Sequence, residues 1–279
     1  MLAGGGLAGI AWETGILRGI ADESPGTAKA LLDADVLVGT SAGSTVAAQL
    51  GSGLGLDVLF DRQTTESSTE LNPDAAVDEI TELFLTAMLT PNTTKAEKLQ
   101  KIGAVALSTA TVTEAVRRDV IAQRLPSHDW PNRVLRISAI DAVAGELVVF
   151  DRNSGVGLVD AVAASCAVPG VWPPVTIGDR RWIDGGVRSP ANADLAAGHD
   201  RVVVVAPMTR ALGPMAATAQ VAALRAAGAR VALVAPDAAA TRAIGRNPLD
   251  PARREPAARA GRAQAAEVAA EVRSVWLDD

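Results

Sequence analysis

Apolar residues follow two patterns along this chain, and each pattern predicts a different kind of element. Short apolar runs predict buried strands at 34–38, 134–139, 145–150, 202–205 and 231–235. Two shorter runs, 175–177 and 181–183, flank Gly178-Asp179, a typical hairpin turn. Because Val202–Val205 is β-branched throughout, we expect it to be a central parallel strand.

Apolar positions at helical spacing alternate with these runs. In the first of these segments Ile10, Ile16, Leu17 and Ile20 share one face. The same spacing predicts helices at 9–20, 44–50, 73–89, 113–125, 158–166, 215–227 and 251–276. Strand and helix signals in alternation indicate an α/β fold. We expect a single domain over 1–279, with 54–126 as a helical insert able to cap a site and 251–276 as a C-terminal helix.

Composition narrows the class of protein. With 48% hydrophobic residues and a net charge of −6, the chain is globular and has no nucleic-acid-binding footprint. Its only cysteine, Cys166, excludes an internal disulfide, and with two histidines it argues against a metal site. No apolar run reaches the roughly 18 residues of a membrane span, and no basic residue precedes the apolar start. We therefore expect a cytoplasmic protein without metal or organic cofactor.

The sequence G-T-S-A-G, residues 39–43, lies between a predicted strand and a predicted helix. A serine in such a tight turn projects its hydroxyl outward, and only small neighbours such as Gly39 and Gly43 tolerate the turn. Ser41 is therefore a candidate nucleophile. The alternative is a tight turn whose serine only caps the helix.

Two more glycine motifs carry candidate chemistry. G-G-G-L-A-G, residues 4–9, can turn successive backbone N–H groups toward one oxyanion. It also matches the dinucleotide-binding pattern, which needs a strand before it and an acid after the next strand, or it is a plain glycine-rich turn. D-G-G, residues 184–186, places Asp184 at a strand end followed by Gly185 and Gly186, although Asp-Gly is also a common turn pair.

Together these motifs resemble the patatin-like phospholipases, a family of serine acyl hydrolases. The order and spacing of G-G-G-L-A-G, G-T-S-A-G and D-G-G agree with the family, and the stretch S-C-A-V-P-G-V-W-P-P-V, residues 165–175, is similar to its segment before D-G-G. The resemblance implies a three-layer α/β/α fold with a mostly parallel sheet. It also implies a dyad of Ser41 as nucleophile and Asp184 as base. The oxyanion hole would then be formed by Gly4, Gly5, Gly6 and Leu7, with Gly9 closing the glycine motif.

The implied activity is hydrolysis of carboxylic esters, in particular lipid acyl esters. Two features depart from the family: Ala8 stands where the family usually has Arg or Lys, and only Met1–Ala3 precede the glycine loop. The first departure keeps open a catalytically silent relative that binds an acyl lipid or a partner. A further alternative is a Ser41–Asp184–His199 triad, which has the chain order of α/β-hydrolases.

The predicted C-terminal helix mixes arginines with acids. It is either a membrane-surface helix, giving a transient membrane contact, or a solvated charged face. The sequence leaves the head group, the acyl chain length and the oligomeric state open.

Overall fold

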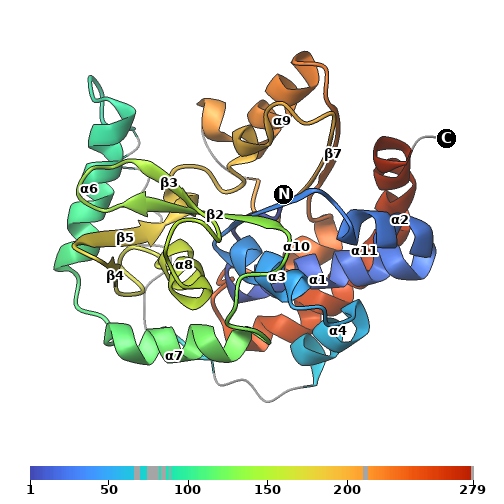
Figure 1. Ribbon diagram of the computed structural model, residues 1–279, viewed down its shortest axis with the longest axis horizontal. Coiled ribbons are helices and arrows are strands. Elements are labelled where there is room, and N and C mark those ends of the chain that lie inside the picture. The colour runs from blue at the N-terminus through green and yellow to red at the C-terminus, as the bar shows by residue number, and fades with distance from the viewer. Residues whose placement is uncertain (66–69, 74–81, 83–85, 88, 210–212, 278–279) are drawn as a thin grey trace.

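A computed structural model describes residues 1–65, 70–73, 82, 86–87, 89–209 and 213–277 (Figure 1). The predicted helix at 73–89 falls almost entirely outside these residues. The strands are β1 (Val36–Thr40), β2 (Val134–Asp141), β3 (Leu147–Phe150), β4 (Val175–Ile177), β5 (Arg180–Asp184), β6 (Arg201–Val205) and β7 (Arg230–Val234).

The seven strands form a mixed sheet. β1 pairs parallel with β2, and β6 pairs parallel with β7. β3 and β5 pair antiparallel with β2, and β4 forms the predicted hairpin with β5. Gly178 in that hairpin has φ of 64°, a conformation that glycine adopts without strain.

Residues 1–3 join the two parallel pairs into one sheet. Leu2 forms parallel bridges to Gly39 of β1 on one side and to Val205 of β6 on the other. Its N–H donates to the Val38 carbonyl at 2.8 Å, and the Ala3 N–H donates to the Val205 carbonyl at 3.0 Å. These three residues are therefore a short central strand, and Figure 1 accordingly places the N-terminus between β2 and β7.

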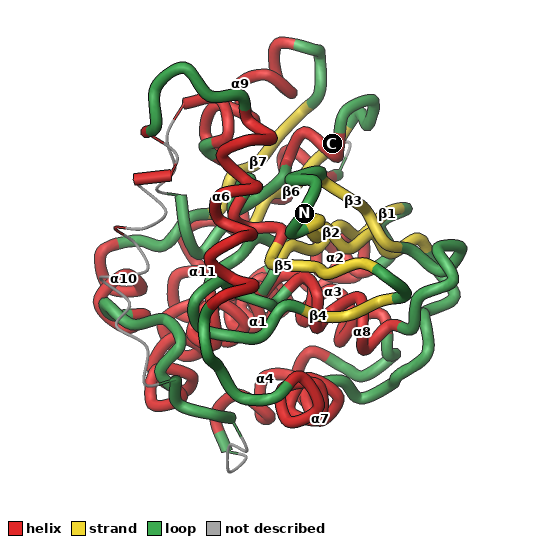
Figure 2. The backbone as a smooth tube through the Cα atoms, turned by 90° about the vertical axis from the view of Figure 1, so that its left-hand side faces the viewer, coloured by secondary structure: helices red, strands yellow, loops and turns green. Residues whose placement is uncertain are grey.

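Alternation along the strands separates two apolar faces. Leu135, Ile137 and Ala139 of β2 pack in the same cluster as Val203 and Val205 of β6. This cluster includes helices α1 (Gly6–Glu23), α3 (Ala42–Gly51), α8 (Leu158–Ser165) and α11 (Arg254–Trp276). The intervening residues face the other side, where β2 packs with helix α6 (Lys95–Ser108) and β6 with helix α9 (Ala217–Ala226). Figure 2 shows α3 and α8 below β1 and β2, and α9 above β6. The fold is therefore the three-layer α/β/α arrangement that the sequence predicts.

The helices follow the predicted periodicity with shifts at their ends. The predicted helices correspond to α1 (Gly6–Glu23), α3 (Ala42–Gly51), α7 (Glu114–Arg124), α8 (Leu158–Ser165), α9 (Ala217–Ala226) and α11 (Arg254–Trp276). Within the predicted helical insert, the structure also forms α4 (Leu56–Thr64) and α6 (Lys95–Ser108). Two short helices were not predicted from the sequence, α2 (Pro25–Leu32) and α10 (Ala238–Ile244).

The long helices α1 and α11 pack closely because small residues meet at their contact. A Cβ atom on Gly15 would lie 2.1 Å from the Ala258 carbonyl oxygen, and one on Gly261 would lie 2.4 Å from that of Trp12. On the outer side of α11, Arg259 pairs with Glu255 at 2.8 Å and Arg262 with Asp22 at 2.7 Å. These ion pairs are compatible with the solvated charged face, and the transient membrane contact of this helix stays a prediction. Among the described helices, none is both long and apolar enough to cross a bilayer.

Candidate active site

The register of the sheet brings Ser41 and Asp184 together. Residues 137 and 138 of β2 pair with both β1 and β3, so these two strands lie on opposite edges of β2. Residues 139 and 140 pair with both β3 and β5, which puts β5 on the same edge as β1. β1 therefore ends opposite Ser138 and β5, running the other way, ends opposite Ala139. Their ends meet head to head, at Ser41 and Asp184.

Ser41 occupies the strained turn that its motif predicts. It has φ of 53° and ψ of −119°, a region that non-glycine residues adopt at a cost of about 1–3 kcal/mol. A Cβ on Gly39 would lie 2.5 Å from the Ser44 Cα, and one on Gly43 would lie 2.1 Å from the Leu2 carbonyl oxygen. Only glycine at both positions lets the chain turn from β1 into α3 this sharply.

The Ser41 side chain donates a hydrogen bond to the Asp184 carboxylate. Asp184 is buried, and its Oδ1 also accepts from the Gly186 N–H at 2.6 Å. Burial raises the pKa of this carboxyl to about 7, although both hydrogen bonds favour the ionised form. A carboxyl with that pKa accepts a proton readily near neutral pH.

The glycine loop runs past Ser41, but not all its N–H groups are free. A Cβ on Gly4 would lie 3.9 Å from the Ser41 Oγ, so the loop lies directly beside the hydroxyl. The Gly4 N–H donates to the Pro190 carbonyl at 2.8 Å, which removes Gly4 from the predicted set of oxyanion donors. Within the described part of the chain, the N–H groups of Gly5, Gly6 and Leu7 have no acceptor. On the described residues, the candidate oxyanion hole therefore has three N–H donors, one fewer than the sequence suggests.

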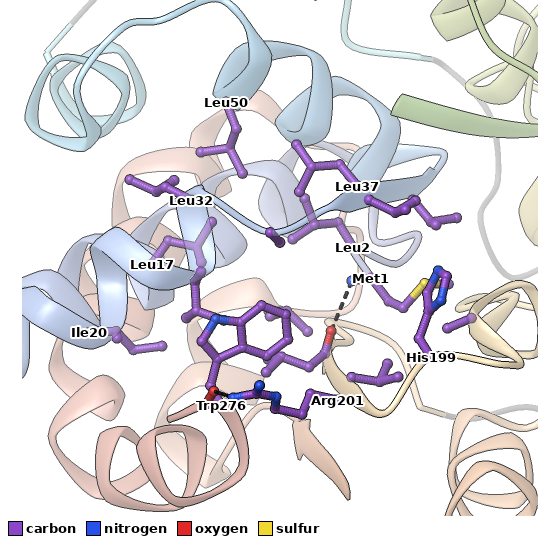
Figure 3. A pocket seen from close by; sticks show the side chains of 18 residues that line it. Met1, Leu2, Leu17, Ile20, Leu32, Leu37, Leu50, His199, Arg201 and Trp276 are labelled. Carbon is purple, nitrogen blue, oxygen red and sulfur yellow. Dashed lines mark hydrogen bonds between the residues drawn. The ribbon is translucent and has the colours of Figure 1, made fainter. Parts of the chain in front are cut away.

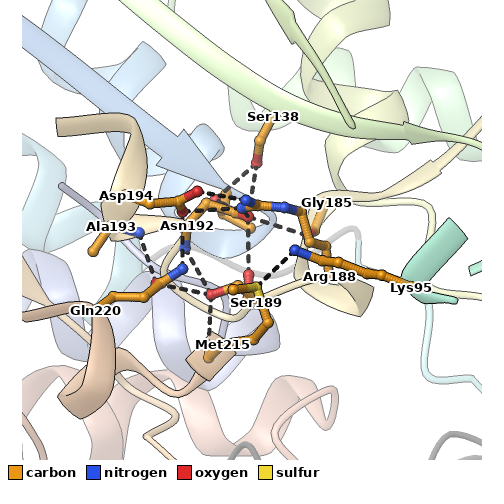
Figure 4. A network of polar contacts seen from close by, with 11 residues as sticks. Lys95, Ser138, Gly185, Arg188, Ser189, Asn192, Ala193, Asp194, Met215 and Gln220 are labelled. Carbon is orange, nitrogen blue, oxygen red and sulfur yellow. Dashed lines mark hydrogen bonds and ion pairs between the residues drawn. The ribbon is translucent and has the colours of Figure 1, made fainter. Parts of the chain in front are cut away.

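A buried polar network behind the sheet ties the two strand ends together (Figure 4). The Asn192 Nδ2 donates to the Thr40 Oγ1 and to the Gly185 carbonyl, both at 3.1 Å. Thr40 adjoins Ser41 and Gly185 adjoins Asp184, so a single side chain fixes both neighbours. Sequence reasoning missed Asn192, since no local motif marks it.

A small pocket opens in front of Ser41, on the side of α7 and α8. Besides Ser41, Gly6 and Leu7, its lining includes Arg117, Arg124, Cys166 and Trp172. Cys166 is buried, its Sγ donates to the Ser41 carbonyl at 3.2 Å, and burial raises the pKa of the thiol. The two arginines were not predicted as site residues, because a charged residue on an amphipathic helix normally faces water. They come from α7, which belongs to the predicted helical insert.

His199 lies away from this site. It precedes β6, whereas Ser41 follows β1, and since both strands run parallel to residues 1–3, the two residues lie at opposite ends of the sheet. His199 instead lines a separate apolar pocket with Met1, Leu2 and Trp276 (Figure 3). The structure therefore gives no support to the triad with His199.

The residues around the glycine loop do not complete the dinucleotide-binding pattern. The dinucleotide interpretation requires an acid after the next strand, but β1 is followed by Ser41. Across the part of the chain that the structure describes, no three His, Cys, Asp or Glu side chains lie together as a metal site would require.

Comparison with known proteins agrees with the motif resemblance. The profile of the family described as "Patatin-like phospholipase" matches residues 1–197. No curated protein matches the chain. A crystal structure of the type III effector protein ExoU superposes over 99% of this chain and 53% of its own, at 17% sequence identity and a TM-score of 0.46, so the chain spans about half of ExoU. Because the family profile matches well over half of its length, this chain belongs to the patatin-like phospholipase family.

Proposed function

We propose that this protein hydrolyses lipid acyl esters through a dyad of Ser41 and Asp184. Family membership supports lipid hydrolase activity in general. The dyad itself is supported by one observation above all, the hydrogen bond from Ser41 to a buried carboxylate whose pKa lies near 7. A base with that pKa needs no histidine as a relay.

In the proposed reaction the Ser41 Oγ attacks the ester carbonyl while Asp184 takes its proton. The carbonyl oxygen becomes an oxyanion, which the N–H groups of Gly5, Gly6 and Leu7 stabilise. The C–O bond then breaks, Asp184 returns the proton to the departing alcohol, and an acyl-enzyme remains on Ser41. Asp184 next takes a proton from water, whose oxygen attacks the acyl carbonyl. The bond between the acyl carbon and the Ser41 Oγ then breaks, Asp184 returns the proton to Oγ, and the carboxylic acid leaves.

The strained turn orients Ser41 for this reaction. Ser41 has a sparsely populated backbone conformation, and its hydroxyl makes no cap bond to α3. The Ser41 N–H instead donates to the Ser165 Oγ at 2.8 Å, which anchors the turn to the end of α8. The nucleophile is thus oriented before substrate arrives.

Labelling with a fluorophosphonate probe tests the proposal, because the probe reacts only with an activated serine. Wild-type protein should label, Ser41→Ala should not, and Asp184→Asn should label at least about 100-fold more slowly, the usual contribution of a general base. His199→Ala is the matched control and should label like wild type. If folded wild type never labels, the chain is instead a silent, lipid-binding relative. If His199→Ala abolishes labelling, the dyad is wrong.

A further inference from the structure

Two arginines, Arg117 and Arg124, are the charged residues that line the pocket in front of Ser41 in the described part of the chain. Arg124 binds the Glu70 carboxylate through two hydrogen bonds, of 2.5 and 2.6 Å. Arg117 lies on the same helix, and its Nη1 approaches the same carboxylate only to 4.0 Å. Both guanidinium groups thus lie near the Glu70 carboxylate, and Arg124 donates hydrogen bonds to both of its oxygens.

Arg117 is left with unused donors. The residue is only 5% exposed, and its buried Nε and Nη1 have no hydrogen-bond partner among the residues that the structure describes. Leaving charged donors unpaired in the interior is costly, so a native protein rarely retains them without use. Burial, and secondarily the charge of Arg124, lowers the pKa of Arg117 to about 9, which still leaves the group charged at neutral pH.

The guanidinium is held in a defined place. Its central carbon lies over the Trp172 ring, 3.8 Å from the ring centre, in a cation–π contact that holds the group against the ring. Arg117 and Trp172 line the same pocket as Ser41 and the glycine loop. The loop 4–9 itself has no charged residue. Any anion that enters with the substrate would therefore meet Arg117 first.

We propose that Arg117 binds an anionic group on the alcohol part of the ester, and so selects phosphate-bearing acyl esters over neutral esters of equal chain length. The inference rests on the proposed function, since it takes the pocket at Ser41 to receive an acyl ester. A phosphate is the anion that lipids carry on their alcohol portion, and its several unesterified oxygens suit the spread donors of a guanidinium. Arg117 is a binding residue here and takes no part in proton transfer.

Equilibrium binding in the Ser41→Ala background tests this without turnover. The probes are a monoacyl glycerophospholipid below its micelle concentration and a monoacylglycerol with the same acyl chain. Ser41→Ala should bind the phosphate-bearing lipid about tenfold or more tightly, the range expected for hydrogen bonds to a charged group. Adding Arg117→Gln should bring that ratio close to one and leave monoacylglycerol binding unchanged.

Arg118→Gln provides the matched control. It removes the same charge from the next residue of α7, but Arg118 lies outside the pocket and pairs with Asp160 at 2.6 Å. The lipid preference should survive this change. An equal loss for both lipids in Arg117→Gln would show a structural role and overturn the proposal, as would an unchanged ratio.

Two further measurements keep the outcome decisive. If Arg117→Gln does not fold, inorganic phosphate should still displace the phosphate-bearing lipid, and not monoacylglycerol, from Ser41→Ala; failure to do so overturns the proposal. Free fatty acid is the third probe: binding of its carboxylate that depends on Arg117, without a preference for phosphate, would make this a product site instead. Loss of fluorophosphonate labelling with the lipid preference intact would defeat only the proposed function.

Discussion

At the residue scale, the chemistry depends on a carboxyl whose protonation is set by burial. Asp184 is fully enclosed, and its two hydrogen bonds do not offset the loss of hydration. The ionised form therefore costs free energy in the folded protein but not in the unfolded chain. Reactivity and stability are in conflict at this residue.

The conflict predicts a pH-dependent gain in stability for Asp184→Asn. The pKa of Asp184 is about 7 when folded against a model value of 3.8, so between these values the folded state binds more protons and wild-type stability falls as pH rises. At pH 8 the variant should be more stable by roughly 2–4 kcal/mol, since each pH unit between the two pKa values corresponds to about 1.4 kcal/mol. Near pH 4 the difference should vanish.

Urea unfolding of both proteins from pH 4 to 8 measures this difference, and groups other than Asp184 cancel in the comparison. A wild type that becomes more stable than Asp184→Asn as pH rises would mean that Asp184 is not a buried, disfavoured carboxylate.

At this scale, sequence reasoning selects the residues that a local motif marks. Ser41 and Asp184 stand out because glycines must flank them. Arg117 and Asn192 do not, since their roles arise only when α7 and the turn before residues 193–196 fold against distant strands. The exclusion of Gly4 as a donor likewise depends on Pro190, which is 186 residues away along the chain.

At the element scale, β2 organises the site by sharing one edge between two strands. β1 occupies that edge up to Ser138 and β5 occupies it from Ala139 onward. The strands themselves were predictable from apolar runs. The division of one β2 edge between β1 and β5 was not, because the identity of a strand's pairing partner leaves no periodic signal in the sequence. The helices α2 and α10, with eight and seven residues, are too short for their periodicity to be recognised.

Packing of α1 against α11 supports the whole layer beneath the site, and it predicts a strong effect of one methyl group. Gly261→Ala places a Cβ 2.4 Å from the Trp12 carbonyl oxygen, so the helices must separate. We expect a loss of about 2–3 kcal/mol in the free energy of unfolding, as for overpacked cores. Denaturant unfolding measures it.

Gly26→Ala is the matched control for that change. Gly26 lies in α2, and a Cβ there meets no atom within 4 Å. Alanine should leave stability unchanged or raise it by up to about 1 kcal/mol, because it restricts the unfolded chain. Equal effects at the two positions would refute close helix packing as the cause.

At the scale of the whole molecule, residues 1–3 hold the two parallel pairs of strands in one sheet. Leu2→Pro removes the N–H that donates to Val38, and should cost about 3 kcal/mol or more because a central strand cannot spare this bond. Leu2→Ile keeps the backbone donor and should be nearly neutral. Urea unfolding and fluorophosphonate labelling should fall together in the proline variant; a stable, fully labelled Leu2→Pro would show that the sheet does not need this strand.

Only three residues precede the glycine loop, and they are too few for an apolar pattern to reveal the strand that they form. The expectation of one domain over 1–279 stays a prediction.

The central position of residues 1–3 also constrains the order of folding. The neighbours of Leu2 are Gly39 and Val205, so half of its pairing must wait until almost three quarters of the printed sequence has been synthesised. Contacts of such long sequence separation slow folding, since the closure entropy is lost before the contacts form. Until β6 arrives, one edge of the strand at residues 1–3 is open to any other chain that offers a strand. During synthesis, correct folding therefore requires that no other strand pairs with this open edge before β6 does.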